Sequence, residues 1–280
     1  MKQNPTVAYQ GEPGAYSEAA ALEHFGTDIE TLPSTSFEQA FEYVQSGQAD
    51  YGMLPIENSL AGSIHRNYDL MVRHDLQVCG EYHFRVSHCL LALPEAKLED
   101  VQRAHSHPQA LAQCEASLNE LGLERLVEAD TAGSARLVKE WNDKQAAAIA
   151  SSRAAEVYGL QILREKLEDQ SNNYTRFLVL SADEKVKAGE GVEYKSSIVF
   201  SLQNIPGALF KALSVFALRD IDLTKIESRP IPEKTWEYLF YVDFIGHAED
   251  LRIKVALDNL SEYAQTFRLL GSYPRHLVSA

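Results

Sequence analysis

The chain has 280 residues, which exceeds the roughly 100–200 residues of a typical domain, so we expect two domains. Its 40 acidic and 26 basic side chains give a formal charge of -14, and this field repels phosphate backbones and anionic lipid. Nucleic acid and membrane surfaces are therefore excluded as expected partners. Three cysteines without metal-ligand spacing, a polar start and no long apolar run favour a protein of the reducing cytoplasm without a metal site.

The first predicted strand, at residues 6–9, leads into the glycine- and proline-containing turn Gly11–Ser17. A helix after such a turn presents backbone N–H groups that bind an anion, although a purely structural turn explains the pattern equally well. The turn lacks the third glycine of the dinucleotide fingerprint. A second strand near residues 29–32 is followed by a helix, because Ser36 and Gln39 have the spacing of a capping box.

A strand at residues 50–54 runs into a polar loop that contains Glu57, Asn58 and Ser59. Loops after strands hold ligands in α/β folds, but solvated loops are also polar, so the two interpretations weigh about equally. Residues 76–93 alternate in part, as in a strand pair or a crossover between two lobes.

A second run of alternating strands and helices follows. We expect strands at residues 101–105, 125–127 and 146–150, and helices that begin near Ser106, Thr131 and Ser151. After a polar segment, the stretch 172–177 enters the apolar run 178–180. The spacing alone predicts that this stretch caps a strand. Considered together with the other polar loops, it also fits a ligand-binding site. We expect two α/β lobes up to residue 182, with a small-anion site in the cleft between them.

Residues 183–195 are charged, contain glycine and lack apolar periodicity, which predicts a linker. Residues 196–280 show the order βαββαβ of a ferredoxin-like domain. Within it, the polar stretches 204–209 and 227–230 lie at strand ends, where they fit either a small zwitterion site or simple turns.

Several motifs occur together in one order. They are Gly11–Ser17, Pro55–Ser59, Ser106–Gln109, Asn173–Phe177, Gly207–Leu209 and Glu227–Pro230. In this combination the chain resembles the prephenate dehydratases that carry a C-terminal ACT regulatory domain. The resemblance covers nearly the whole chain and implies two lobes of the type II periplasmic-binding-protein kind followed by the ACT domain.

The resemblance also implies an activity and its control. Prephenate would lose water and carbon dioxide to give phenylpyruvate, without a cofactor, and L-phenylalanine would inhibit at ACT-domain interfaces of a homo-oligomer, a dimer of dimers. We expect the monofunctional form of the family, because no chorismate mutase segment stands before residue 6.

Roles for individual residues follow from the resemblance together with the chemistry. Family members are expected to use Thr175 on the leaving hydroxyl, but a threonine hydroxyl is a poor acid at neutral pH. We therefore predict that Thr175 donates a hydrogen bond and that Glu57 supplies the proton or an electrostatic partner. Asn58 and Gln113 would orient the hydroxyl. The predicted substrate-binding residues are Arg176, Phe177, Ser59, Ser106 and Ser151, and the predicted effector-binding residues are Asn204, Gly207, Ala208, Leu209, Glu227, Ser228, Arg229 and Pro230.

Two alternatives remain open. Ala15 stands where many relatives have threonine, and residues 60–69 look similar to plant arogenate dehydratases, so the substrate could be arogenate, which has an amino group in place of the keto oxygen. The second alternative is a sensor that binds an amino acid without catalysis. The joint presence of Glu57, Asn58, Gln113 and Thr175 argues against it, because binding of a carboxylate does not require them.

Overall fold

The structure is a computed structural model that describes residues 4–231, 234 and 236–277. Its contacts divide the chain into two compact units, each discontinuous in sequence. Unit 1 comprises residues 1–64 and 83–177, and unit 2 comprises residues 65–82 and 178–280. The division runs through two strands, β5 (Gln77–Arg85) and β11 (Tyr174–Ser181).

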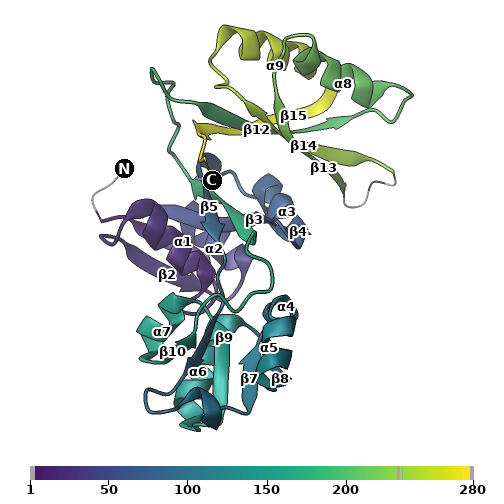
Figure 1. Cartoon of the computed structure of the whole chain (residues 1–280). Helices are drawn as coiled ribbons and strands as arrows, with labels where there is room; N and C mark the ends of the chain where they lie inside the picture. Colours follow the sequence, from purple (N-terminus) through teal and green to yellow (C-terminus); the bar gives the residue numbers. More distant parts are fainter. Residues whose placement is uncertain (1–3, 232–233, 235, 278–280) are drawn as a thin grey trace. The chain divides into compact units, whose positions relative to one another are not determined.

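The first sheet has the strand order β2-β1-β3-β11-β5, with β4 paired to β3. Figure 1 labels β2, β3, β4 and β5 of this sheet. Strand β1 runs parallel to β2 and to β3, as strand–helix–strand crossovers require. Ser36 caps helix α2, since its side chain accepts a hydrogen bond from the backbone N–H of Gln39. The remaining elements of this lobe are β1 (Thr6–Gln10), α1 (Tyr16–Phe25), β2 (Glu30–Ser34), α2 (Phe37–Gln45), β3 (Tyr51–Asn58) and β4 (Gly62–Ser63).

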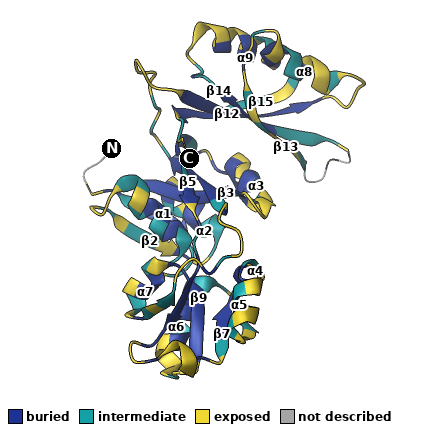
Figure 2. Ribbon diagram, viewed as in Figure 1, coloured by how far each residue is buried: buried dark blue, intermediate teal, exposed yellow. Residues whose placement is uncertain are grey.

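The second sheet of unit 1 has the order β10-β6-β9-β7-β8. Its central strand β9 consists of four alanines and an isoleucine and is buried throughout (Figure 2). Small side chains let helix α6 pack closely on this strand. The elements are β6 (Cys89–Ala92), the 3-10 helix η1 (Leu98–Asp100), β7 (Arg103–Ser106), α4 (Pro108–Gln113), α5 (Glu115–Leu121), β8 (Glu124–Val127), α6 (Thr131–Trp141), β9 (Ala146–Ala150), α7 (Ser152–Tyr158) and β10 (Gln161–Arg164).

Unit 2 contains an antiparallel sheet of order β13-β14-β12-β15, and helices α8 and α9 contribute to its core with Phe216, Ile253 and Leu260. Helix α3 (His65–Arg73) and most of β5 also belong to this unit. Arg268 donates hydrogen bonds to the carbonyl oxygens of Met71, His74 and Leu76, so its guanidinium satisfies groups at the C-terminal end of α3. The other elements are β12 (Tyr194–Leu202), α8 (Ala208–Ala217), β13 (Leu223–Pro230), β14 (Tyr238–Ile245), α9 (Leu251–Tyr263) and β15 (Ala264–Pro274).

The predicted fold class is confirmed: two α/β lobes precede a ferredoxin-like domain. Residues 76–93 form two strands in different sheets, so this stretch is the crossover between the lobes rather than a hairpin. Several details differ from the expected elements. Glu57 and Asn58, which were expected in a loop, belong to strand β3, and residues 65–73, where no element was expected, form helix α3. The helix after Pro108 is broken at Cys114 into α4 and α5, and the polar segment after Gly159 contains the edge strand β10. The predicted domain boundaries at residues 182 and 195 stay a prediction.

Candidate active site

A cavity of about 280 Å³ in unit 1 is lined by side chains from both of its lobes. The first lobe contributes Asn58 from β3 and Thr175 from β11, and the second contributes Gln113 from α4. The cavity therefore brings together three of the four predicted catalytic residues. Its full lining is Gln10, Tyr16, Ser17, Pro55, Asn58, Ile64, Val86, His88, His107, Gln109, Ala110, Gln113, Thr131, Asn173, Thr175 and Phe177.

Asn58 joins the two strands of the first lobe. Its Nδ2 lies 2.8 Å from Oδ1 of Asn173 and 3.0 Å from Oγ1 of Thr175. Its Oδ1 accepts hydrogen bonds from the backbone N–H groups of Leu60 and Ala61. Since Oγ1 of Thr175 already accepts a hydrogen bond, its own hydrogen is available to a ligand.

The network continues into the second lobe through Gln113. Its Oε1 lies 3.2 Å from Nδ2 of Asn173 and 2.8 Å from Nε2 of His88. On the far side of the imidazole, Nδ1 of His88 lies 2.6 Å from the hydroxyl of Tyr16. Burial lowers the pKa of His88 from its usual 6.5 and raises the pKa of Tyr16 well above its usual 10, so the imidazole is neutral and the phenol keeps its proton at pH 7.

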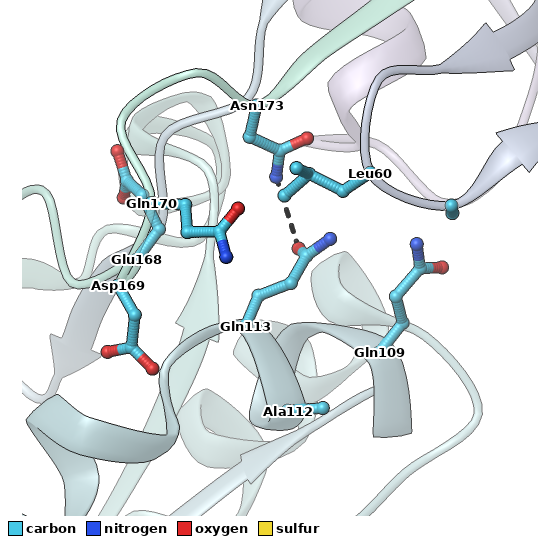
Figure 3. Close-up of a pocket in the computed structure, with 9 residues that line it drawn as sticks. Leu60, Gln109, Ala112, Gln113, Glu168, Asp169, Gln170 and Asn173 are labelled. Carbon is cyan, nitrogen blue, oxygen red and sulfur yellow. Dashed lines mark hydrogen bonds between the residues drawn. The ribbon is translucent and has the colours of Figure 1, made fainter.

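A larger cavity of about 500 Å³ adjoins the first and shares Gln109, Gln113 and Asn173 with it (Figure 3). It also borders on two carboxylates, Glu168 and Asp169. Both carboxylates accept backbone hydrogen bonds, Glu168 from His88 and Asp169 from Ala116. Their negative charge disfavours binding of the expected substrate prephenate, which carries two carboxylates, so the smaller cavity is the better candidate for the reaction site.

The three predicted substrate-binding serines are committed to backbone groups. Ser106 donates to the carbonyl oxygen of Ile149 at 2.6 Å, and Ser59 donates to that of Asn172 at 2.8 Å. Ser151 donates to Gly14 and accepts from Ala154, so it caps α7. These hydroxyls shape the walls around the cavity, and their contact with substrate stays a prediction.

Strand alternation separates the other predicted residues. Thr175 and Phe177 both line the cavity, whereas Arg176 between them is buried and points to the opposite face of β11. In the same way, Asn58 lines the cavity and the half-buried Glu57 is not among the described lining residues. The predicted binding of the substrate by Arg176 and the predicted role of Glu57 as proton source or electrostatic partner stay predictions.

The two ends of the turn Gly11–Ser17 have different functions. Gly14 and Pro13 pack against helix α7 of the second lobe, through Ser151 and through a hydrogen bond from Tyr158 to the carbonyl oxygen of Pro13. Tyr16 and Ser17, which begin α1, line the cavity. The turn is thus a structural joint at one end and a cavity wall at the other.

The predicted effector residues lie at two places in unit 2. Asn204, Ala208 and Leu209 line a cavity of about 120 Å³ beside Trp236 and Phe240. On β13, Arg229 makes a two-pronged ion pair with Asp69 on α3. In the described lining of that small cavity, residues 227–230 do not occur. The L-phenylalanine site stays a prediction.

Sequence reasoning missed the roles of Tyr16, His88 and Asn173. Tyr16 and Asn173 occurred within motifs, but no local pattern distinguished them from turn residues. His88 occurred in an alternating run typical of a strand, and its contacts with Tyr16 and Gln113 span 72 and 25 positions. Among the described residues, no cluster of three or more His, Cys, Asp and Glu side chains is arranged to hold a metal ion. The described helices include none with the length and apolar character to span a membrane.

Comparison with known proteins gives the family. The family model for prephenate dehydratase matches residues 7–185, and the ACT domain matches residues 196–262. The chain belongs to the prephenate dehydratase family. It is 49% identical to "Arogenate dehydratase/prephenate dehydratase 1, chloroplastic" of Arabidopsis thaliana over 97% of this chain and 72% of the relative.

Two solved structures are similar to this chain over nearly its whole length. One, from Arthrobacter aurescens, is a prephenate dehydratase in complex with L-Phe; it is 33% identical, with a TM-score of 0.88 over 96% of this chain and 90% of that chain. The other is described as "GqqA- a novel type of quorum quenching acylases" and is 39% identical, with a TM-score of 0.91 over 97% and 98% of the two chains.

Proposed function

We propose that this chain converts prephenate into phenylpyruvate, carbon dioxide and water, and that L-phenylalanine inhibits it through the ACT domain. The observation that carries this proposal is the meeting of Asn58, Gln113 and Thr175 around one cavity in a chain that belongs to the prephenate dehydratase family. The effector assignment is supported by the Arthrobacter relative, whose structure holds L-Phe.

The reaction needs little from the protein beyond orientation and a proton. The bond to the ring carboxylate breaks and its electron pair enters the ring, which becomes aromatic, while the ring hydroxyl leaves with its own electron pair. The departing hydroxide takes up one proton to become water. Donors aimed at this oxygen stabilise the charge that develops there. In our proposal the Thr175 hydroxyl and the Gln113 amide are these donors, and Glu57, next to the lining residue Asn58, is the proton source or an electrostatic partner.

The ring carboxylate gains from a site that does not pair it strongly, because its charge disperses as the bond breaks. Among the described residues, the lining of the cavity contains neither Lys nor Arg. Phe177 contributes a buried apolar wall. A lining of this composition suits a decarboxylation better than tight binding of an anion. It therefore argues against a protein that only binds a carboxylate without catalysis.

Arogenate is a second candidate substrate, since the Arabidopsis relative is named for both activities. The same bond changes would then give phenylalanine instead of phenylpyruvate. Purified protein should be incubated with each substrate in parallel, with phenylpyruvate followed by ultraviolet absorbance and phenylalanine by amino-acid analysis. Faster turnover of prephenate, inhibited by L-phenylalanine, is the expected result; turnover of neither substrate would remove the proposal.

An acylase activity is a further candidate because of the similar structure described as an acylase. Acyl transfer requires an activated nucleophile. The Tyr16 hydroxyl contacts His88, but burial raises the pKa of this phenol, which opposes its ionisation. Hydrolysis of an N-acyl amide should be measured in the same assay, and we expect it to be slow relative to dehydration.

We also propose a homo-oligomer, a dimer of dimers. Unit 2 exposes large apolar side chains, among them Phe210, Leu218 and Leu251, each about four-fifths exposed in the isolated chain. Such exposure is typical of surfaces that another subunit covers. Light scattering of the wild type and of Phe210→Asp tests this; a wild-type monomer at micromolar concentration would contradict it.

For the cellular location we propose the cytoplasm. All three cysteines are free, and burial raises the pKa of the Cys89 thiol to about 11 and of the Cys79 thiol to about 12, which keeps them protonated. Free thiols fit a reducing compartment. The Arabidopsis relative is named as chloroplastic. Fractionation of cells that contain the protein decides between the cytoplasm and another compartment.

A further inference from the structure

The orientation of the Asn58 amide is set by two backbone groups. Leu60 and Ala61 place their N–H groups 3.0 and 2.9 Å from its Oδ1. A backbone N–H can only donate, so the oxygen of the Asn58 amide must face this turn. Its NH2 group then faces Asn173 and Thr175, and both must accept from it.

The orientation of the Asn58 amide determines the orientations of the next two side-chain amides, those of Asn173 and Gln113. Since Oδ1 of Asn173 accepts from Asn58, its own NH2 group faces Gln113, and Oε1 of Gln113 accepts at 3.2 Å. Figure 3 shows this hydrogen bond, with the nitrogen of Gln113 turned away from Asn173. The NH2 group of Gln113 therefore has two hydrogens to offer to the adjoining cavities that this residue lines.

The last link is His88, which is 2% exposed. Its Nε2 lies 2.8 Å from Oε1 of Gln113, which is an acceptor, so Nε2 must carry the hydrogen. The neutral ring then has a bare Nδ1, and this atom accepts from the hydroxyl of Tyr16 at 2.6 Å. Two backbone amides in one lobe thus dictate the tautomer of a histidine through a chain of three side-chain amides.

We propose that His88 is a positioning residue, which holds the amide of Gln113 through the Nε2–H donor so that the Gln113 NH2 group and the Thr175 hydroxyl both face the leaving oxygen of the substrate. The proposal rests on the proposed dehydratase function. Without the His88 donor, the Gln113 amide loses one of its two hydrogen bonds to described side chains, keeps the one of 3.2 Å from Asn173, and gains freedom to rotate. Two donors fixed before the reaction stabilise the departing hydroxide without reorganisation.

Kinetics of two His88 variants test this role. His88→Leu removes the donor and should lower kcat about 10- to 100-fold, with a smaller change in KM. His88→Gln places an amide NH2 near the position of Nε2, and kcat should recover about tenfold or more relative to His88→Leu. Equal kcat in both variants, or a wild-type kcat in His88→Leu, would overturn the proposal.

A double-mutant cycle separates positioning from general damage. If His88 acts through Gln113, then His88→Leu should have little further effect on kcat in a Gln113→Ala protein, since coupled residues are not additive. A full additional loss in that background overturns the proposal. Circular dichroism and thermal unfolding of each variant verify that it is folded.

The tautomer can be measured on the wild-type protein, and a variant serves only to assign the signal. With ¹⁵N-labelled histidine, the shifts of the His88 ring, assigned by its loss in His88→Gln, should report hydrogen on Nε2 and a bare Nδ1. An active wild type with hydrogen on Nδ1 removes the positioning role alone. An inactive wild type removes the proposed function, and the positioning role with it, whatever the tautomer.

Discussion

Gly14 lies so close to Ala154 that a Cβ atom added to the glycine would be 2.7 Å from the Cα of Ala154. The glycine also has a φ of +89°, in the region that side chains disfavour. Gly14 belongs to the turn before α1 in the first lobe and Ala154 to α7 in the second. The contact therefore fixes how closely the two lobes of unit 1 approach, next to the cavity that they share.

Gly14→Ala should lower the free energy of unfolding by about 2–5 kcal/mol, because it adds a clash to an unfavourable backbone conformation. Gly47→Ala is the matched control, since Gly47 has a φ of +76° and nothing within 4 Å of the added Cβ. The control should lose only about 1–2 kcal/mol, the backbone cost alone. Urea unfolding of both proteins measures the difference; equal losses would show that the Ala154 contact is loose.

Thr175→Val keeps the shape of the side chain and removes its hydroxyl. If this hydroxyl donates to the leaving oxygen, kcat should fall about 10²- to 10³-fold, as for loss of one donor in a preorganised site. Thr175→Ser keeps the donor and should retain kcat within about tenfold. Steady-state kinetics with the better of the two substrates measures this, and a Thr175→Val protein as active as Thr175→Ser would exclude the role.

Glu57→Gln tests the proton source. Loss of a general acid typically costs about 10²- to 10⁴-fold, so we expect a fall of this size in kcat at neutral pH. The exposed Glu42 on α2 gives the control variant Glu42→Gln, which should leave kcat unchanged. Undiminished turnover in Glu57→Gln would show that the proton comes from another donor.

In unit 2, Lys195 and Glu81 form a buried ion pair with Nζ and Oε2 2.8 Å apart. Lys195→Met removes the ammonium group that pairs with the buried Glu81 carboxylate, which should cost about 3–5 kcal/mol of stability. The double variant Lys195→Met/Glu81→Gln removes both charges and should recover most of this loss. Denaturant unfolding that finds the double variant no more stable than the single one would mean that packing, not charge, sets the cost.

The stability of the protein should depend on His88 at acid pH. The folded-state pKa lies below 6.5 because burial disfavours the imidazolium, against smaller opposing effects of Gln113 and the Glu168 carboxylate. The unfolded chain therefore binds more protons, and the free energy of unfolding should fall as pH decreases from 6.5 through the folded pKa, by at most about 1.4 kcal/mol per pH unit. His88→Gln should flatten this slope, because it removes the group that titrates. The same slope in His88→Gln and wild type would contradict the prediction.

The sequence by itself determined the fold class, the family and most of the elements. Apolar periodicity, the Ser36 cap and the small-residue strand at 146–150 are local signals. A helix or strand with one buried face has apolar residues at a regular spacing, so a short stretch of sequence is enough to predict it. The motifs at Pro55–Ser59 and Asn173–Phe177 likewise identify Asn58 and Thr175 as candidate site residues.

Only the tertiary structure decided which of those polar groups face the cavity. Ser106 and Ser151 give their hydroxyls to carbonyl oxygens 43 and 137 positions away, and no local pattern records such a partner. The place of His88 in the site likewise depends on contacts between residues far apart in the sequence, with Tyr16 and with Gln113. In a row of hydrogen-bonded side chains, the donor and acceptor of each bond depend on the bond before it. The N–H groups of Leu60 and Ala61 therefore set the orientation of all three side-chain amides, and only the fold brings these groups together.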